Sequence, residues 1–113
     1  MKDLPEPDAT LARRVFEEAP FEQRLVLFHY GRRTGPVTIT IYTMWEILGF
    51  LELPHPEFDL EKLAGWIDAA VGDTDLAHAL RDLAPMAEDR EKKFERIKYL
   101  IALRLQQCRS RLG

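Results

Sequence analysis

Histidine, the side chain best suited to metal or acid–base chemistry, occurs at only three positions, and His78 has the most suggestive neighbours. Asp75 lies three residues before it and Asp82 four residues after it. On a helix these three residues would share one face and could offer two carboxylates and an imidazole to a metal ion. A metal site in a helical bundle also needs comparable ligands on a second helix, and the chain carries only this one set. We therefore interpret the group as a solvated polar face and expect no metal or cofactor site.

The sequence gives equally little support for a catalytic nucleophile or a phosphate-binding site. Cys108 is the only cysteine, and its place on an apolar helical stripe predicts a buried, inert thiol. Neither a serine nucleophile elbow nor a GxGxxG segment is present, and the GRRTG segment lacks the spacing of a phosphate-binding loop. Glu17 and Glu18 cannot act as an acid and base on one helix face, because adjacent helical residues point about 100° apart. We therefore expect no catalytic residues and a protein that acts by binding, not as an enzyme.

The bulk composition is that of an ordinary globular domain. With 113 residues, 46% hydrophobic and 31% charged, the chain is long enough for one hydrophobic core and too short for two. We expect a single helical domain over 1–113, with the proline-rich residues 1–7 frayed. The lone cysteine allows no internal disulfide, and no apolar run has the length of a signal peptide or a membrane span. These features predict a cytoplasmic protein without a membrane partner.

The net charge of −3 conceals a strong division along the chain. From Glu46 to Asp89 there are eleven acidic residues and two basic ones, whereas from Arg90 onward there are eight basic and two acidic. The two regions could attract each other within one chain or between two chains of an antiparallel dimer. They could also be two solvated helix faces of opposite sign.

Most of the chain has the apolar spacing of amphipathic helices. Clear helical patterns cover about 8–19, 59–71, 74–83 and 85–111, and Pro54 and Pro56 form a rigid break before the second of them. Asp59 is a suitable N-cap, Asp73 or Thr74 caps the helix after it, and Gly72 is a suitable stop between the two. The pattern predicts an all-α fold, a small irregular bundle of about five helices.

Residues 24–42 allow two interpretations. As strands, RLVLFHY and PVTITIY are two runs of β-forming residues joined by the glycine-containing loop GRRTG. As a helix from Pro36, the segment carries an amphipathic seam with spacings of four, three, four and three, formed by Val37, Ile41, Met44, Leu48 and Leu51. Because this stripe is longer than the strand alternation, we favour the helix and keep a short β-hairpin around 24–42 as the alternative.

The segment 85–111 predicts a long amphipathic C-terminal helix. It would be about 40 Å long, whereas a globule of this size is roughly 34 Å across. An overhanging apolar stripe is unfavourable in water, so we expect a second copy or another protein to cover it. The expected contact residues are Phe94, Ile97, Ile101 and Leu105 for apolar packing and Arg104 and Arg111 for charge. Trp45 and Trp66 are further candidate anchors, because large aromatic side chains carry much of the energy of interfaces.

These features together predict a non-enzymatic protein-interaction module. It would be an accessory or regulatory subunit that forms a homodimer or binds a partner protein through its C-terminal helix.

A resemblance suggests an alternative function. The run APFEQRLVLFHYGRRTG followed by TITIYTMWEILGF is similar to the helix-turn-helix part of sigma-factor region 4 and related regulators, which share an EQR-like start, an apolar helix and an EILG segment. The resemblance covers about thirty residues and implies a DNA-binding transcriptional regulator. It departs from that pattern after Gly49, where two prolines and an acidic helix stand in place of a basic recognition helix. DNA binding would then use the C-terminal helix, with Arg90, Lys93, Arg104 and Arg111 on one side.

Overall fold

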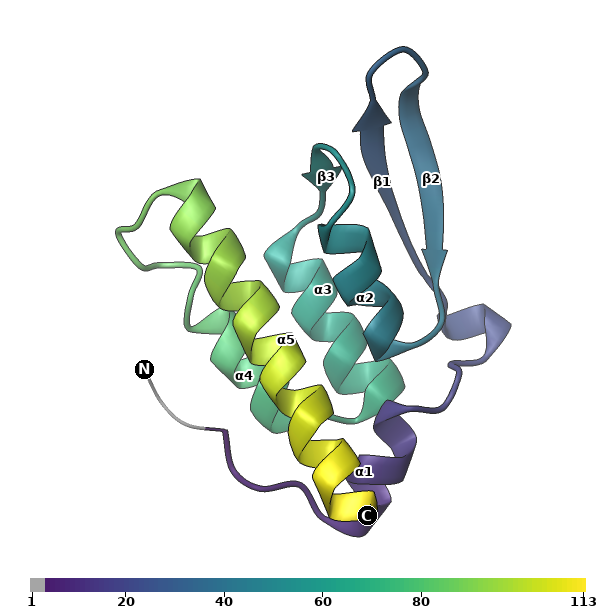
Figure 1. The fold of residues 1–113 in the computed structure, drawn as a ribbon, viewed down its shortest axis with the longest axis vertical. Coiled ribbons are helices and arrows are strands. Elements are labelled where there is room, and N and C mark those ends of the chain that lie inside the picture. Colours follow the sequence, from purple (N-terminus) through teal and green to yellow (C-terminus); the bar gives the residue numbers. More distant parts are fainter. Residues whose placement is uncertain (1–3) are drawn as a thin grey trace.

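The computed structural model describes residues 4–113, which form five α-helices and one small β-sheet (Figure 1). In chain order the elements are α1 (Ala9–Val15), β1 (Leu25–Gly31), β2 (Gly35–Ile41), α2 (Met44–Leu51), β3 (Pro56–Glu57), α3 (Leu60–Trp66), α4 (Thr74–Arg81) and α5 (Arg90–Leu112). A 3-10 turn, η1 (Phe21–Gln23), precedes β1, and a π-helical segment, η2 (Ile67–Val71), extends α3. The prediction of an all-α fold is therefore wrong. The fold is mixed α/β, because β1 pairs with both other strands in an antiparallel sheet of order β2-β1-β3.

The hairpin of β1 and β2 presents one face to the helices and the other to solvent. Its register pairs Leu25 with Ile41 and Leu27 with Ile39. Leu25, Leu27 and Ile41 are buried, whereas the residues between them on β1 are exposed. This alternation is the pattern of a half-buried strand.

The helix expected from Pro36 begins only at Met44. Five β-branched residues in succession, from Val37 to Ile41, lose rotamer freedom in a helix but pack well on a pleated sheet. At the loop end of β2, Gly35 has a φ of 69°, a conformation that favours glycine. At the other end, Glu46 Oε1 accepts a hydrogen bond from Thr43 N at 2.9 Å and so defines the start of α2. The strand preference of residues 37–41 and this cap together outweigh the helical spacing.

The long helix α5 forms one side of the core and packs against α1, α2 and α4 (Figure 1). Its inward side chains belong to the same buried cluster as the inward residues of the hairpin. The helix begins at Arg90, because Asp89 Oδ1 accepts a hydrogen bond from Lys92 N at 2.8 Å and caps it there. Pro85, the expected start, lies in the loop that precedes this cap.

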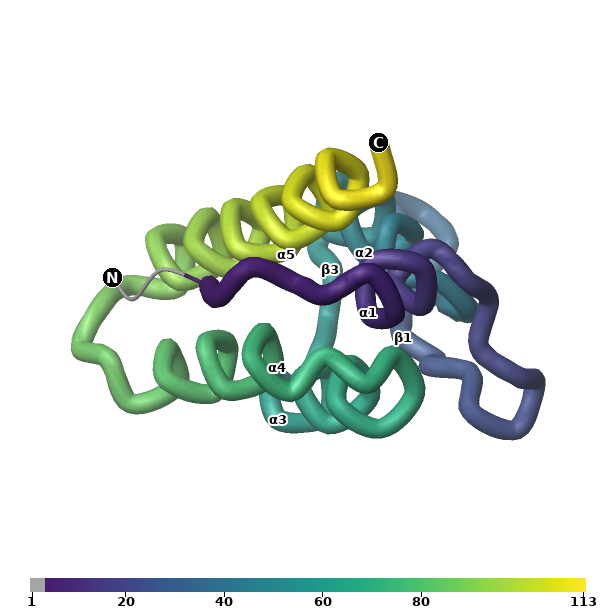
Figure 2. The backbone as a smooth tube through the Cα atoms, turned by 90° about the horizontal axis from the view of Figure 1, so that it is seen from below, coloured from purple at the N-terminus to yellow at the C-terminus, as the bar shows by residue number. Residues whose placement is uncertain are grey.

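The N-terminal segment is packed along the helical body. Figure 2 shows it passing between α5 and α4 before it enters α1. Leu4 is buried, and its carbonyl oxygen accepts a hydrogen bond from Gln107 Nε2 at 3.3 Å. The Pro5 carbonyl oxygen accepts one from Arg104 Nη1 at 2.8 Å. The expectation of a frayed start therefore does not hold for residues 4–7, and residues 1–3 of that prediction lie outside the described residues.

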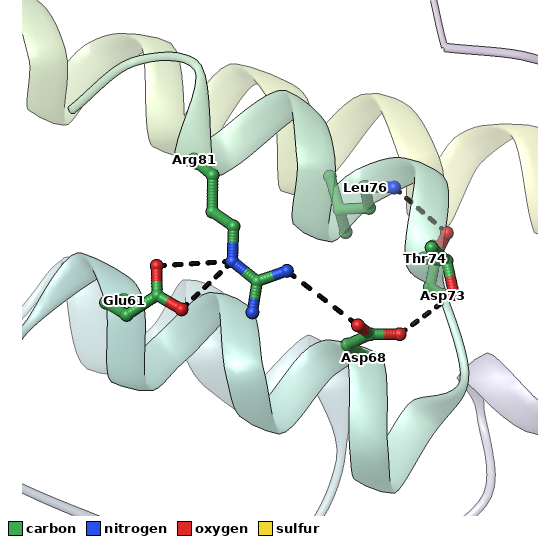
Figure 3. Close-up of polar contacts among 6 residues, drawn as sticks. All are labelled: Glu61, Asp68, Asp73, Thr74, Leu76 and Arg81. Carbon is green, nitrogen blue, oxygen red and sulfur yellow. Dashed lines mark hydrogen bonds and ion pairs between the residues drawn. The ribbon is translucent and has the colours of Figure 1, made fainter. Parts of the chain in front are cut away.

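Polar contacts at the surface join α3 and η2 to α4 (Figure 3). Arg81 Nε donates to the two carboxylate oxygens of Glu61 at 3.0 and 3.2 Å, and its Nη1 lies 3.7 Å from Asp68 Oδ2. Thr74 Oγ1 donates to Asp68 Oδ1 at 2.8 Å. Because Glu61 is exposed, these contacts orient the two helices more than they stabilise them.

Gly72 ends η2 in the left-handed region, with a φ of 83°, and a Cβ at this position would lie 2.9 Å from Nη1 of Arg14. We expect Gly72→Ala to lower the free energy of unfolding by about 1–2 kcal/mol. The matched control is Gly49→Ala within α2, where a Cβ would meet open space and where we expect a gain of about 0.5–1 kcal/mol. Urea unfolding measures both changes. A gain at both positions would contradict the conformation assigned to Gly72.

Candidate functional site

The apolar stripe of α5 that was expected to bind a partner belongs to the core of the chain itself. Ile97, Ile101 and Leu105 are 3%, 0% and 8% exposed. Phe94 is half-buried and packs against Phe58, with ring centroids 6.2 Å apart. Ile101 and Leu105 are therefore not available to another molecule, and Phe94 is only partly so. The docking surface inferred from the length of the helix is therefore replaced by packing within the chain.

Arg104, expected to complement a charge on the partner, is completely buried. Its Nε lies 2.9 Å from Oδ2 of Asp73, which is also buried, and its Nη1 donates hydrogen bonds to the Pro5 carbonyl oxygen and to Gln107 Oε1. Burial raises the pKa of Asp73 above its usual value of 3.8, and the nearby Arg104 guanidinium partly opposes this rise. The pair joins α5 to the start of α4. Arg111, the second expected cation, is exposed near the end of α5.

The two tryptophans have opposite environments. Trp66 is 8% exposed, and its Nε1 donates a hydrogen bond to the Gln23 carbonyl oxygen at 2.6 Å. It therefore packs in the core and fixes the chain just before β1. Trp45 lies in the first turn of α2 and is 56% exposed, so it is accessible to a partner.

Basic residues of α5 pair with the acidic middle of the same chain. Arg90 Nη2 lies 3.9 Å from Glu57 Oε1, and Lys98 Nζ lies 3.5 Å from Glu52 Oε1. The acidic middle and the basic end of the sequence thus attract each other within one chain, which is one of the arrangements expected from the sequence.

The four cations that were expected to face DNA on α5 differ in their surroundings. Arg104 is buried against Asp73, Arg90 Nη2 lies 3.9 Å from Glu57 Oε1, and Lys93 Nζ donates a hydrogen bond to the Ala84 carbonyl oxygen at 2.9 Å. Arg111 is exposed. The buried Arg104 therefore interrupts the row of cations that was expected to bind phosphates.

The side chains considered for metal or nucleophilic chemistry are not brought together. Asp75, His78 and Asp82 are all exposed on or just after α4. Across residues 4–113, no three side chains of histidine, cysteine, aspartate or glutamate converge as a metal site requires. Cys108 is buried, and this burial raises the pKa of its thiol from 9.0 to about 11. The thiol is therefore neutral and shielded at physiological pH.

The solvent-facing side of the hairpin carries large apolar side chains, and we call it the outward face. On β1 it contains Val26, Phe28 and Tyr30, which are 38%, 41% and 42% exposed. On β2 the residues paired with Val26 and Phe28 are Thr40 and Thr38. The rings of Phe28 and Tyr30 meet edge to face, with centroids 5.9 Å apart. Figure 1 shows the hairpin extending beyond the helices, so this face is accessible along most of its length.

The tip of the hairpin is cationic. Arg32 and Arg33 occupy the loop between the strands and are exposed. From Leu25 to Tyr42 the sequence contains no acidic residue, although the whole chain has a net charge of −3. Among the described residues, no carboxylate forms an ion pair with either arginine. The hairpin is thus a positively charged projection from an otherwise acidic body.

A cleft of about 300 Å³ adjoins the outward face, between β1 and the start of α3. Val26 and Phe28 line one side, and Phe58 and Lys62 line the other. Lys62 Nζ lies 3.5 Å from the Val26 carbonyl oxygen, at the edge of β1. The cleft therefore extends the apolar surface, and its rim carries Lys62 together with the carboxylates of Glu57 and Asp59.

The sequence contained a signal for the outward face that the helical interpretation passed over. Val26, Phe28 and Tyr30 recur with the period of two that a strand requires. Their neighbours Leu25 and Leu27 are also apolar, so the run looks uniformly hydrophobic and the period does not stand out. Trp45, a candidate anchor from the sequence, is exposed.

No protein-family model, curated protein or solved structure matches this chain. Within residues 4–113, no helix combines the length and apolar character needed to cross a bilayer. The function must therefore be argued from the surface itself.

Proposed function

We propose that this chain is a non-enzymatic protein-interaction module, an accessory or regulatory subunit that docks a partner protein on the outward face of its hairpin. One observation carries the proposal: Val26, Phe28 and Tyr30 stand in solvent on a projecting strand beside a cationic tip. The lone cysteine, buried as a free thiol, supports a cytoplasmic setting for this activity.

The outward face offers a partner apolar area to bury. Phe28 and Tyr30 are each about two-fifths exposed. Covering the exposed part of one such ring contributes about 2 kcal/mol at the usual value for buried apolar area. Two adjacent rings of this kind resemble the aromatic hot spots of protein interfaces. Trp45, on the helix that follows β2, is a further exposed aromatic residue that could extend the contact.

A protein partner suits this face better than a nucleic acid. The rings of Phe28 and Tyr30 are nearly perpendicular, at 84°, so they do not form the flat platform on which successive bases stack. Glu57 and Asp59 border the adjoining cleft and would repel phosphates. The proposal therefore does not include the DNA-binding alternative. It predicts that duplex DNA added at low salt produces no binding signal.

The double substitution Phe28→Ser with Tyr30→Ser should abolish the binding of a partner protein without unfolding the chain. Each ring is about two-fifths exposed and the two pack against each other, so we expect a melting temperature that falls by a few degrees with an unchanged far-ultraviolet circular dichroism spectrum. Affinity purification from the producing cells, followed by quantitative mass spectrometry, should show the loss of at least one protein by more than about tenfold.

The matched control is Tyr99→Ser, which removes an aromatic ring that is 53% exposed on α5, away from the hairpin. It should retain the same protein at the wild-type yield. Equal recovery of every protein by the wild-type chain and the double variant would refute a docking role for the outward face.

A further inference from the structure

The strand β2 forms a free edge of the sheet. In the order β2-β1-β3 it has a neighbour on one side only, and no backbone hydrogen bond within residues 4–113 joins Gly35–Ile41 to a segment other than β1. In Figure 1 no other element runs along the outer side of its upper part. Exposed strand edges of this kind are templates for pairing with another chain.

The sequence of β2 leaves this edge largely unprotected. Natural edge strands are usually guarded by lysine, by inward-pointing charges or by bulges. From Gly35 to Tyr42 there is no charged residue, and the register with β1 is continuous from Gly31 to Leu25. Pro36, which lacks an N–H group, blunts one end of the edge. At the other end the backbone of Tyr42 is already bonded, its N–H to Glu46 Oε1 at 3.0 Å and its carbonyl oxygen to Ala19 N at 2.7 Å. Pairing would therefore involve Val37 to Ile41, all of which are β-branched and favour the extended conformation.

We infer that β2 accepts an extended, acidic segment of a partner protein as a fourth strand of the sheet. The inference rests on the proposed function and specifies the partner. Backbone hydrogen bonds to β2 would give affinity, and side chains at alternate positions of the segment would give specificity. About five residues pair with Val37–Ile41, and the end of the segment near the hairpin tip carries aspartate or glutamate.

Charge complementarity selects an acidic segment. Arg32 and Arg33 stand at the loop end of β2 and have no acidic neighbour on the hairpin. A strand added to β2 runs about 4.8 Å from it, well within reach of an arginine side chain at the tip. Carboxylates at that end of the added strand would therefore compensate both guanidinium groups.

The same charges argue against a second copy of this chain as the occupant. Parallel pairing of β2 with β2 of another copy would bring together two hairpin tips that each carry cations and no carboxylate between Leu25 and Tyr42. Like charges across such an interface oppose association. Antiparallel pairing would place each tip beside the base of the other hairpin, where the Tyr42 carbonyl oxygen already accepts a hydrogen bond from Ala19 N at 2.7 Å. The occupant we infer is consequently a different protein.

The test uses a library of random dodecapeptides displayed on phage and selected on the full chain. We expect the enriched peptides to carry aspartate or glutamate at one end and β-branched or aromatic residues at alternate positions. The variant Arg32→Ser with Arg33→Ser should bind the best peptide roughly tenfold more weakly at low salt. The matched control, Arg109→Ser with Arg111→Ser, removes two exposed cations from the end of α5 and should bind as the wild type does.

Amide hydrogen exchange, measured by NMR with and without the best peptide, locates the contact. Strand addition predicts that alternate amides of β2 exchange at least roughly tenfold more slowly in the complex. Chemical-shift changes of the Phe28 and Tyr30 side chains in the same NMR samples, with unchanged β2 amide exchange, would overturn strand addition and leave the proposed function in place. A footprint outside the hairpin, or no enriched peptide, would overturn both.

Two further outcomes would name a different occupant and refute the inference. In one, the chain without peptide sediments as a dimer whose β2 amides are already protected. In the other, a single-stranded dodecanucleotide displaces the best peptide at a lower concentration than the unlabelled peptide does.

Discussion

The variant Ile101→Asp is expected to unfold, because the side chain it replaces is 0% exposed at the centre of α5. A carboxylate at this position would be removed from water without a partner, which costs more than about 4 kcal/mol. A domain of this size has a total stability of about 5–15 kcal/mol, so little or none would remain. Far-ultraviolet circular dichroism and urea titration measure the loss.

The neighbouring Ala102 provides the control, since it is exposed on a face of the same helix about 100° away from Ile101. Ala102→Asp should lower the free energy of unfolding by only about 0.7 kcal/mol, the difference in helix propensity. If Ile101→Asp instead converted an oligomer into a well-folded monomer, Ile101 would be an interface residue and its place in the core would be refuted.

Arg104→Met is expected to have the second largest effect. The substitution keeps the apolar stem but leaves the buried Asp73 carboxylate without its partner, and it also removes the hydrogen bond to the Pro5 carbonyl oxygen. Breaking a buried ion pair from one side typically costs about 3–5 kcal/mol. Arg109→Met, at an exposed position of α5, is the control and should be nearly neutral in urea unfolding.

A second substitution distinguishes the ion pair from simple packing. Asp73→Asn removes the buried charge but keeps an oxygen that can accept the hydrogen bond from Leu76 N at the start of α4. Added to Arg104→Met, it should restore at least about 1 kcal/mol of the lost stability, because no uncompensated charge remains. If the losses of unfolding free energy from the two single substitutions simply added in the double variant, the ion pair between Asp73 and Arg104 would contribute nothing to stability.

Local signals in the sequence located the ends of several helices correctly. Asp59 accepts a hydrogen bond from Glu61 N, Asp73 accepts one from Leu76 N, and Gly72 adopts the left-handed conformation. Such caps depend on residues only a few positions apart, so sequence alone reveals them. The fold class failed at residues 37–41, where helical spacing and β-branched composition gave opposite indications. The pairing of these residues with β1 decides for the strand, and the spacing of apolar residues along the sequence does not reveal that pairing.

The candidate site was harder to predict, because burial is a property of the whole fold. Ile97 and Ile101 were correctly placed on one apolar stripe, but the sequence does not show that α1, α2 and α4 cover that stripe. Arg104 lies on the same stripe and reads as a surface cation until Asp73, thirty-one positions earlier, is found beside it. The outward face of the hairpin became visible only once the strands were paired.

The hydrogen bond between Arg104 and the Pro5 carbonyl oxygen joins positions 99 residues apart. During synthesis the segment around Pro5 therefore remains without its final partner until α5 has been made. Contacts of such long sequence separation form late and slow folding, because a large loop must close before they form. The helical body consequently reaches its final packing only after α5 has been made.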